Sequence, residues 1–289
     1  MSHPLACEDI SLTTPDQRSL PATLFLPEQS NGLSVQINSA TLTPRGYYKA
    51  FAGFLAERGF TVLTYDCRAM VVQGRALRDE KSGVLDWGTH DQLAATEWLR
   101  NRFPDLRLTL VAHSLGGQIL GLSPRASAPQ AILMVATAHG YWRNWPWRQR
   151  LQMLVQNHLL KPLQIALFGY VPKGMGPGLP LSARAARDFS RFQHHPAFFC
   201  DEAGNALRPY NDDIRVPLRH ITFSDDEVVH PGTEIDLAMF YPQAVRRHDR
   251  MTPADYGMER VGHFGFFRRS MSRAAWEDAA AWLQQSTVA

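Results

Sequence analysis

The chain has few cysteines, and the three present, Cys7, Cys67 and Cys200, are far apart in the sequence. They match neither a disulfide framework nor the paired ligand spacing of a zinc site, so we expect reduced thiols in a cytoplasmic protein. The N-terminal residues lack a basic stretch followed by an apolar one, and no segment approaches the ~18 apolar residues of a membrane span. The sequence therefore predicts a protein that is not secreted and has no membrane span.

An excess of charge of one sign is also missing. The formal net charge is +3 over 289 residues, with Lys and Arg scattered, so we expect no nucleic-acid partner. Neither Gly-x-Gly-x-x-Gly nor a phosphate-binding loop ending in Lys-Ser or Lys-Thr is present, which argues against a nucleotide cofactor. His194, His195 and His230 form no metal-binding pattern, so we expect no metal and no other cofactor. The sequence predicts no particular oligomeric state.

Apolar strands and amphipathic helices alternate along most of the chain. Residues 7–12 and 20–26 favour an opening antiparallel hairpin. Such alternation predicts an α/β fold, with a mostly parallel central sheet covered by helices on both faces. The later strands are expected at 35–37, 61–65, 108–111, 131–135, 218–223 and 244–251, and the helices at about 47–58, 90–101, 118–122, 234–240 and around Trp276.

The alternation stops after Ala136 and resumes near residue 217. We therefore expect a core domain made of residues 1–136 and 209–289, interrupted by an inserted cap at 137–208 that is rich in aromatic residues. The aromatic side chains could close over an apolar ligand, with the Gly/Pro-rich segment 174–178 as a hinge. Alternatively, they form the core of the cap itself.

The segment 112–117, Ala-His-Ser-Leu-Gly-Gly, is typical of a nucleophile elbow, because it follows an apolar strand and precedes a helix-compatible stretch. The strand and the helix approach closely at such a turn, so small residues are needed two positions before and after the serine. Gly116 meets this requirement, and Ala112 replaces the usual first glycine with the smallest possible side chain. We expect Ser114 to be a nucleophile and His113 to be structural, since neighbours on a sharp turn point apart.

A serine hydroxyl needs a base to take its proton, and the base needs a carboxylate that fixes its orientation. In this fold type, the acid follows a late strand and the histidine lies between the last strand and the last helix. Asp226 follows the strand expected at 218–223, and His263 occupies the later loop. Asp225 is the alternative acid, because the two aspartates are adjacent.

These segments together resemble the α/β-hydrolase superfamily, and more narrowly a branch of bacterial predicted hydrolases similar to serine aminopeptidases and lysophospholipase-like esterases. The resemblance covers nearly the whole chain and implies an α/β-hydrolase fold with a Ser114–His263–Asp226 triad. It is carried by residues 37–41, 65–68, 86–88, the elbow at 112–117, residues 139–142, Asp225-Asp226 and residues 262–268.

The resemblance also implies an oxyanion hole made of two backbone N–H groups. The first is that of Leu115, directly after the nucleophile. Aligning Asn-Ser-Ala at 38–40 with the usual His-Gly-x loop makes Ala40 the second donor, with Thr41 as the alternative. Ala-Met-Val-Val at 69–72 stands where a Gly-rich turn is usual, and we expect this departure to reshape the rim of the pocket.

The leading hypothesis is a serine hydrolase that cleaves a small-molecule carboxylic ester through an acyl-enzyme. An alkoxide leaves more readily than an amine, and the cap offers no set of carboxylates to recognise a peptide N-terminus. Aromatic residues favour a substrate with a hydrophobic acyl or alkyl part, and Tyr141, Trp142 and Phe264 are the candidate contacts. Two alternatives are an acyltransferase that uses the same triad and a non-catalytic binding protein on a hydrolase scaffold.

Overall fold

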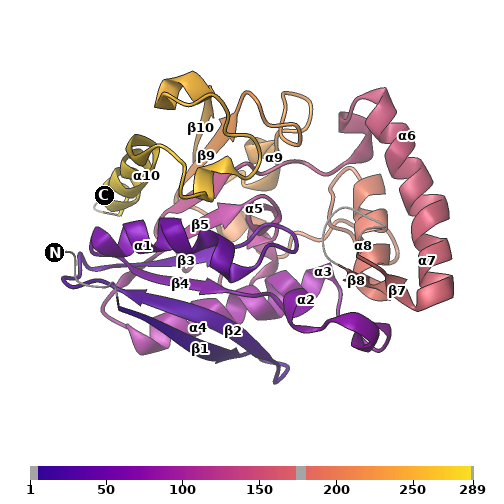
Figure 1. Cartoon of the computed structure of the whole chain (residues 1–289), viewed down its shortest axis with the longest axis horizontal. Helices are drawn as coiled ribbons and strands as arrows, with labels where there is room; N and C mark the ends of the chain where they lie inside the picture. The colour runs from indigo at the N-terminus through magenta and orange to yellow at the C-terminus, as the bar shows by residue number, and fades with distance from the viewer. Residues whose placement is uncertain (1–5, 174–179, 288–289) are drawn as a thin grey trace.

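A sheet of eight strands forms the centre of the molecule, which Figure 1 shows in a computed structural model. The structure describes residues 6–173 and 180–287, so the Gly/Pro-rich segment 174–178 lies outside the described residues. The strand order is β1-β2-β4-β3-β5-β6-β9-β10; β2 is antiparallel to both neighbours, and the later pairs are parallel. The strands are β1 (Ala6–Thr13), β2 (Ser19–Leu26), β3 (Leu33–Asn38), β4 (Thr61–Tyr65), β5 (Arg107–His113), β6 (Ile132–Val135), β9 (Pro217–Phe223) and β10 (Val245–Met251).

Helices cover both faces of this sheet. Side chains alternate between the faces along β5: Val111 packs with the cluster that includes α1 and α10, whereas Leu110 and Ala112 pack into the cluster on the opposite face. The predicted α/β fold with a mostly parallel sheet is confirmed. The helices of the core are α1 (Lys49–Glu57), α2 (Arg68–Val71), α3 (Val84–Asp86), α4 (Leu93–Arg102), α5 (Leu115–Gln118), α9 (Leu237–Phe240) and α10 (Arg273–Gln285).

Two helices differ in extent from the sequence pattern. The helix expected at 118–122 begins earlier, as the single turn α5, and continues as a 3₁₀ turn at Leu120–Leu122. Proline disfavours the helical conformation of the residue before it, so Pro124 accounts for the extended Ser123 and for the end at Leu122. The second helix, α9, is shorter than expected: it begins only after Asp236, whose carboxylate accepts the N–H groups of Ala238 and Met239 as an N-cap.

The segment between β6 and β9 carries most of the remaining structure. It contains α6 (Trp147–Val155), α7 (Lys161–Phe168), α8 (Ala183–His194) and the two short strands β7 (Tyr170–Val171) and β8 (Leu181–Ser182). Figure 1 shows this segment on the right of the molecule, with α6 and α7 farthest from the sheet. No helix within the described ranges combines the length and the apolar character that crossing a bilayer requires.

Three aromatic side chains of this segment pack into the core. Phe192 of α8 contacts Phe198 and Phe199, which also contact each other, with ring centroids 5.0–5.9 Å apart. All three are buried in the same apolar cluster as Leu110 and Ala112 of β5. These aromatics therefore pack on the sheet and do not form a core that belongs to the cap alone. Trp147 differs, because 68% of it is exposed.

The departure at residues 69–72 is accommodated by a helical turn. Arg68–Val71 form α2, and Val72 is extended, so these residues need no left-handed conformation. A positive φ appears only further on, at Gly74, where φ is 62°. The Gly-rich turn of the resemblance is therefore replaced by a short helix whose Ala69 and Met70 pack against the core.

A buried ion-pair network ties the opening hairpin to the core. The Arg68 guanidinium donates to Asp91 Oδ1 at 2.8 Å and to both carboxylate oxygens of Asp16 at 2.8 and 2.9 Å. The Arg68 backbone N–H donates to the other Asp91 oxygen at 2.8 Å. Asp91 is fully buried, whereas Asp16 lies in the hairpin turn, where hydrogen bonds from Arg68 lower the pKa of its carboxyl. Arg68 is thus the counter-charge that makes burial of Asp91 tolerable.

Replacing Arg68 by methionine should lower the free energy of unfolding by about 3–5 kcal/mol, because Asp91 would remain buried without its cation. Urea denaturation monitored by circular dichroism measures this change. The exposed Arg75 provides the matched control: Arg75→Met should change stability by less than about 0.5 kcal/mol. Equal losses in the two variants would contradict the assigned role of the network.

Candidate active site

Ser114 occupies a strained turn between β5 and α5. Its φ of 52° and ψ of −116° lie outside the regions that residues with a side chain ordinarily adopt. The turn is also crowded: a Cβ added to Gly116 would lie 2.5 Å from the Asn38 carbonyl oxygen. A Cβ on Gly117 would lie 2.3 Å from Thr137 Oγ1. The close approach of β3 thus requires the small residue expected at Gly116, and the close approach of the chain after β6 requires another at Gly117.

His263 joins Ser114 to Asp226. Its Nε2 lies 3.0 Å from Ser114 Oγ, and its Nδ1 lies 2.9 Å from Asp226 Oδ2. A carboxylate only accepts hydrogen bonds, so Nδ1 carries the proton and Nε2 presents its lone pair to the serine hydroxyl. The histidine is therefore oriented to take the proton of Ser114.

The two adjacent aspartates have different partners. The Asp226 carboxylate is fully buried, and its second oxygen accepts the N–H groups of Val228 at 2.7 Å and Val229 at 3.0 Å. Asp225 Oδ2 instead accepts the N–H groups of Val261 at 2.9 Å and Gly262 at 3.0 Å. Asp226 thus contacts the histidine ring, whereas Asp225 holds the loop that carries it.

A second chain of hydrogen bonds runs behind the serine. His113 Nε2 lies 2.9 Å from the carbonyl oxygen of His263, and His113 Nδ1 lies 2.9 Å from the Tyr48 hydroxyl. Because the carbonyl can only accept, Nε2 carries the proton of the neutral ring, and Tyr48 donates to Nδ1. Burial, reinforced by the neighbouring His263, lowers the pKa of His113 to about 3, so the ring is neutral. His113 thus positions the backbone of His263.

The Tyr48 hydroxyl also accepts the backbone N–H of Ala40 at 2.8 Å. This contact corrects the expectation for the second oxyanion donor, since an N–H bound to a buried tyrosine is not directed at a substrate oxygen. The alternative, Thr41, lies in a tight turn in which the Thr43 N–H donates to the Ala40 carbonyl oxygen. Leu115, the other expected donor, is the first residue of α5, where a backbone N–H has no partner within the helix.

Of the three candidate substrate contacts, Phe264 lies at this site. Its ring is 5.0 Å from the ring of His263 and 5.4 Å from that of His113, centroid to centroid, and it is partly exposed. Tyr141 packs on His139, and Trp142 packs beside His194. Among the ring contacts of the described residues, neither touches His263.

Two tyrosines were not among the predicted site residues. Tyr47 donates to the Phe264 carbonyl oxygen at 2.5 Å, and Tyr48 forms the contacts with His113 and Ala40. Both directly precede α1, within the helix expected at about 47–58. The signal available in the sequence was the hydroxyl itself, because a tyrosine that packs against the core needs a hydrogen-bond partner.

No group of three or more His, Cys, Asp or Glu side chains within residues 6–173 and 180–287 is arranged to hold a metal ion.

Comparison with known proteins bears on the fold. The sequence profile described as "Alpha/beta hydrolase family" matches residues 32–278. No curated protein sequence matches the chain. The esterase domain of a Rhodothermus marinus protein has a TM-score of 0.55 at 16% identity, over 98% of this chain and all of that one.

Two further structures agree over similar lengths. The esterase Pf2001 of Pyrococcus furiosus has a TM-score of 0.58 at 15% identity, over 98% of this chain and 94% of its own. The alpha/beta hydrolase GrgF of Penicillium sp. sh18 has a TM-score of 0.62 at 14% identity, over 99% of this chain and all of its own. At such identities, the likeness concerns the fold alone.

The neutral, buried state of His113 predicts a pH dependence of stability. Between its ordinary pKa of about 6.5 and its folded value of about 3, the unfolded chain takes up a proton that the folded chain does not. This contribution to stability is therefore fully present above pH 6.5 and is lost as the pH falls toward 3. His113→Gln keeps a donor and an acceptor but does not titrate.

Urea denaturation of both proteins between pH 7 and 4 measures this effect. The wild-type protein should lose up to about 1.4 kcal/mol per pH unit more than His113→Gln. His220, whose pKa burial also lowers to about 3, is present in both proteins and cancels in the comparison. Parallel stability profiles would mean that His113 is not held neutral.

Proposed function

Because this chain belongs to the alpha/beta hydrolase family, we propose that it is a serine hydrolase that cleaves carboxylic esters through an acyl-enzyme. The observation that carries the proposal is the unbroken line of hydrogen bonds from Ser114 Oγ through the His263 ring to Asp226. A serine in that setting is activated by its base, and the base is fixed in the tautomer that can accept its proton.

The proposed reaction begins when His263 Nε2 takes the Ser114 proton and Oγ attacks the ester carbonyl carbon. The carbonyl oxygen becomes an oxyanion, for which the Leu115 and Thr41 backbone N–H groups are the proposed donors; Ala40 is left out because Tyr48 occupies its N–H. The tetrahedral intermediate then expels the alkoxide, which receives the proton from His263. Water attacks the acyl-enzyme by the same steps and restores Ser114.

An ester with an apolar part is the proposed substrate class. An alkoxide is a better leaving group than an amine, and Phe264 offers an exposed aromatic surface beside His263. The esterases from Rhodothermus marinus and Pyrococcus furiosus share this fold and support the choice of an ester substrate.

A series of esters of rising acyl length tests this substrate class, and a preference for charged aminoacyl amides would contradict it. Added acceptor alcohols, followed by product analysis, separate hydrolysis from acyl transfer.

The domain division and the cellular setting belong to the same proposal. Residues 137–208 are proposed as a cap on a core formed by 1–136 and 209–289, with the described part of that cap packed on the core through α8 and the phenylalanines around it.

Cys7, Cys67 and Cys200 are free thiols, which supports a reducing, cytoplasmic setting. Assignment to the bacterial branch stays a prediction.

Labelling with a fluorophosphonate probe tests for the activated serine. The native protein should gain the mass of one probe, whereas Ser114→Ala should gain none under the same conditions. The intact mass of each protein is the measurement, and digestion locates the adduct. A native protein that forms no adduct would favour the alternative of a non-catalytic binding protein.

The neighbouring aspartates give a matched pair of variants for the acid. Asp226→Asn should lower kcat on an ester substrate by a factor on the order of 10⁴, because an amide cannot fix the histidine tautomer as a carboxylate does. Asp225→Asn keeps an oxygen acceptor for the Val261 and Gly262 N–H groups, so its loss should stay within about tenfold. The reverse order of effects would assign the acid to Asp225.

A further inference from the structure

One long helical stretch exposes its apolar side chains to solvent. The π turn Gln156–Leu160 joins α6 to α7, so the helix runs from Trp147 to Phe168 along the outer edge of the molecule in Figure 1. Its large exposed apolar residues recur every four positions and are between 42% and 68% exposed. We call them the apolar stripe: Trp147, Leu151, Val155, Leu159, Leu163 and Leu167.

The side of the same helix that faces the protein is mixed in character. The structure describes every residue from Trp147 to Phe168: Asn157 and Gln164 are buried, and Met153, Leu154, Leu160, Ile165 and Phe168 are partly buried. Asn157 donates to the Gln193 side chain of α8 at 2.8 Å. Apolar residues therefore lie on the inner side as well, and the six of the stripe are left in contact with water, which is unfavourable. A continuous apolar stripe of this kind on the surface marks a contact surface for a partner or an apolar medium.

The charged residues around the apolar stripe are mostly basic. Arg143, Arg148 and Arg150 are exposed at its Trp147 end, and Lys173 is exposed beyond its other end. No aspartate or glutamate occurs in the sequence between Asp105 and Asp188, and the exposed Glu202, which lines a cavity with Asn157 and His158 of this helix, is paired with Arg184. Two copies of such a face would repel each other, whereas an anionic surface would attract it.

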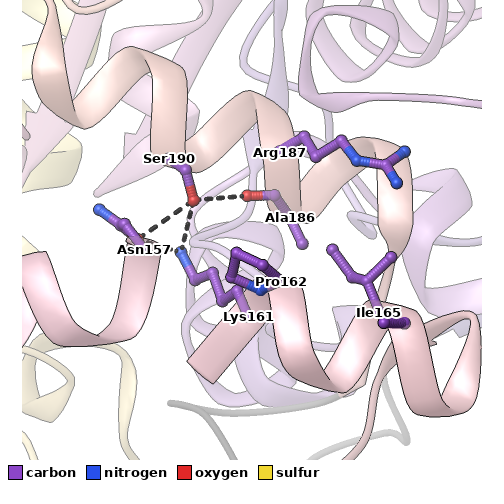
Figure 2. Close-up of a pocket in the computed structure, with 8 residues that line it drawn as sticks. Asn157, Lys161, Pro162, Ile165, Ala186, Arg187 and Ser190 are labelled. Atoms are coloured by element: carbon purple, nitrogen blue, oxygen red, sulfur yellow. Dashed lines mark hydrogen bonds between the residues drawn. The ribbon is translucent and has the colours of Figure 1, made fainter. Parts of the chain in front are cut away.

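A basic groove lies beside the apolar stripe. A cavity of about 310 Å³ lies between α7 and α8, and Lys161 and Arg187 are among the residues that line it (Figure 2). The Lys161 amine donates to two uncharged groups, Asn157 Oδ1 at 2.7 Å and Ser190 Oγ at 3.4 Å. Burial lowers the pKa of Lys161 to about 8.

The groove is open to an anion. Its lining contains two cations and no carboxylate. The nearest acid along the chain, Asp188, is buried and paired with Arg184 and Arg191. Pro162 and Ala166 in the cavity wall adjoin stripe residues in the sequence, so the groove and the stripe belong to one surface.

We propose that the helix Trp147–Phe168 docks on an anionic lipid surface. The apolar stripe enters the boundary of the acyl chains, the arginines around Trp147 face the anionic lipids, and the groove at Lys161 and Arg187 takes an anionic head group. A helix with an apolar face, a basic flank and a tryptophan at one end is suited to lie in the interface of a bilayer. Docking is a binding event and does not depend on the proposed esterase activity.

Flotation with vesicles tests the docking. Vesicles of phosphatidylcholine with phosphatidylglycerol should carry the full-length protein to the top of a density gradient, and vesicles of phosphatidylcholine alone should carry far less. Raising the salt concentration should weaken the binding, since it screens the charge attraction. A wild-type protein that floats with neither vesicle would overturn the proposal, as would equal binding to both.

Matched variants assign the binding to the stripe. The double variant Leu159→Glu, Leu163→Glu should weaken partitioning into anionic vesicles by at least about tenfold, because it removes two apolar side chains that would otherwise be transferred from water to the bilayer. Met239→Glu with Val245→Glu adds the same charge at exposed apolar positions on α9 and β10 and should bind like the wild type. Equal weakening by both pairs would show only an effect of net charge and would overturn the proposal.

Two further measurements distinguish a loss of lipid binding from a folding defect. All four substituted residues are exposed, so unchanged circular dichroism spectra are expected. Anionic vesicles should shift the tryptophan emission of the wild-type protein to the blue, and Trp147→Phe should lose most of that shift. Gel filtration without lipid tests whether a second copy of the chain covers the stripe instead. If the wild-type protein is a dimer and the double variant Leu159→Glu, Leu163→Glu is a monomer, the stripe is a contact between two copies of the chain, which would contradict the proposal.

Discussion

The turn at Ser114 is held in a left-handed conformation because β3, β5 and α5 meet with no space for another side chain. Gly116 lies against the Asn38 carbonyl, so the chain must leave β5 sharply and present the serine hydroxyl at the end of the strand. Parallel neighbours end at the same edge of the sheet, and the loop after β9 brings Asp226 there. Backbone strain at Ser114 is sustained by packing around it, and that packing keeps Oγ within reach of His263.

Much of this arrangement could be predicted from the sequence, because it depends on short-range patterns. Apolar runs located the strands of the parallel sheet, and the small residues around Ser114 identified the turn. The order of serine, acid and histidine then suggested which loops meet, since parallel strands share one edge. The choice of Asp226 over Asp225 as the residue that touches His263 matches the observed contact. Its chemical role is still a prediction.

The errors came from contacts between segments far apart in the sequence. Ala40 was assigned to the oxyanion hole by alignment, but the hydroxyl of Tyr48 takes its N–H, and a pattern of apolar positions does not distinguish tyrosine from phenylalanine. Trp147 belongs to the aromatic residues expected either to close over a ligand or to form the core of the cap, yet it is 68% exposed on the outer side of a helix. The net charge of +3 describes the whole chain, so it gave no indication that the sequence between Asp105 and Asp188 contains no acidic residue.

The central claim is that an acyl group passes through Ser114. The most direct measurement is to mix the enzyme with an ester that it turns over, quench with acid at short times, and locate any acyl group by mass spectrometry of the digested protein. The account predicts an acylated peptide that contains Ser114, with turnover and acylation both lost in Ser114→Ala. An acyl group on a different residue, or turnover that persists in Ser114→Ala, would contradict it.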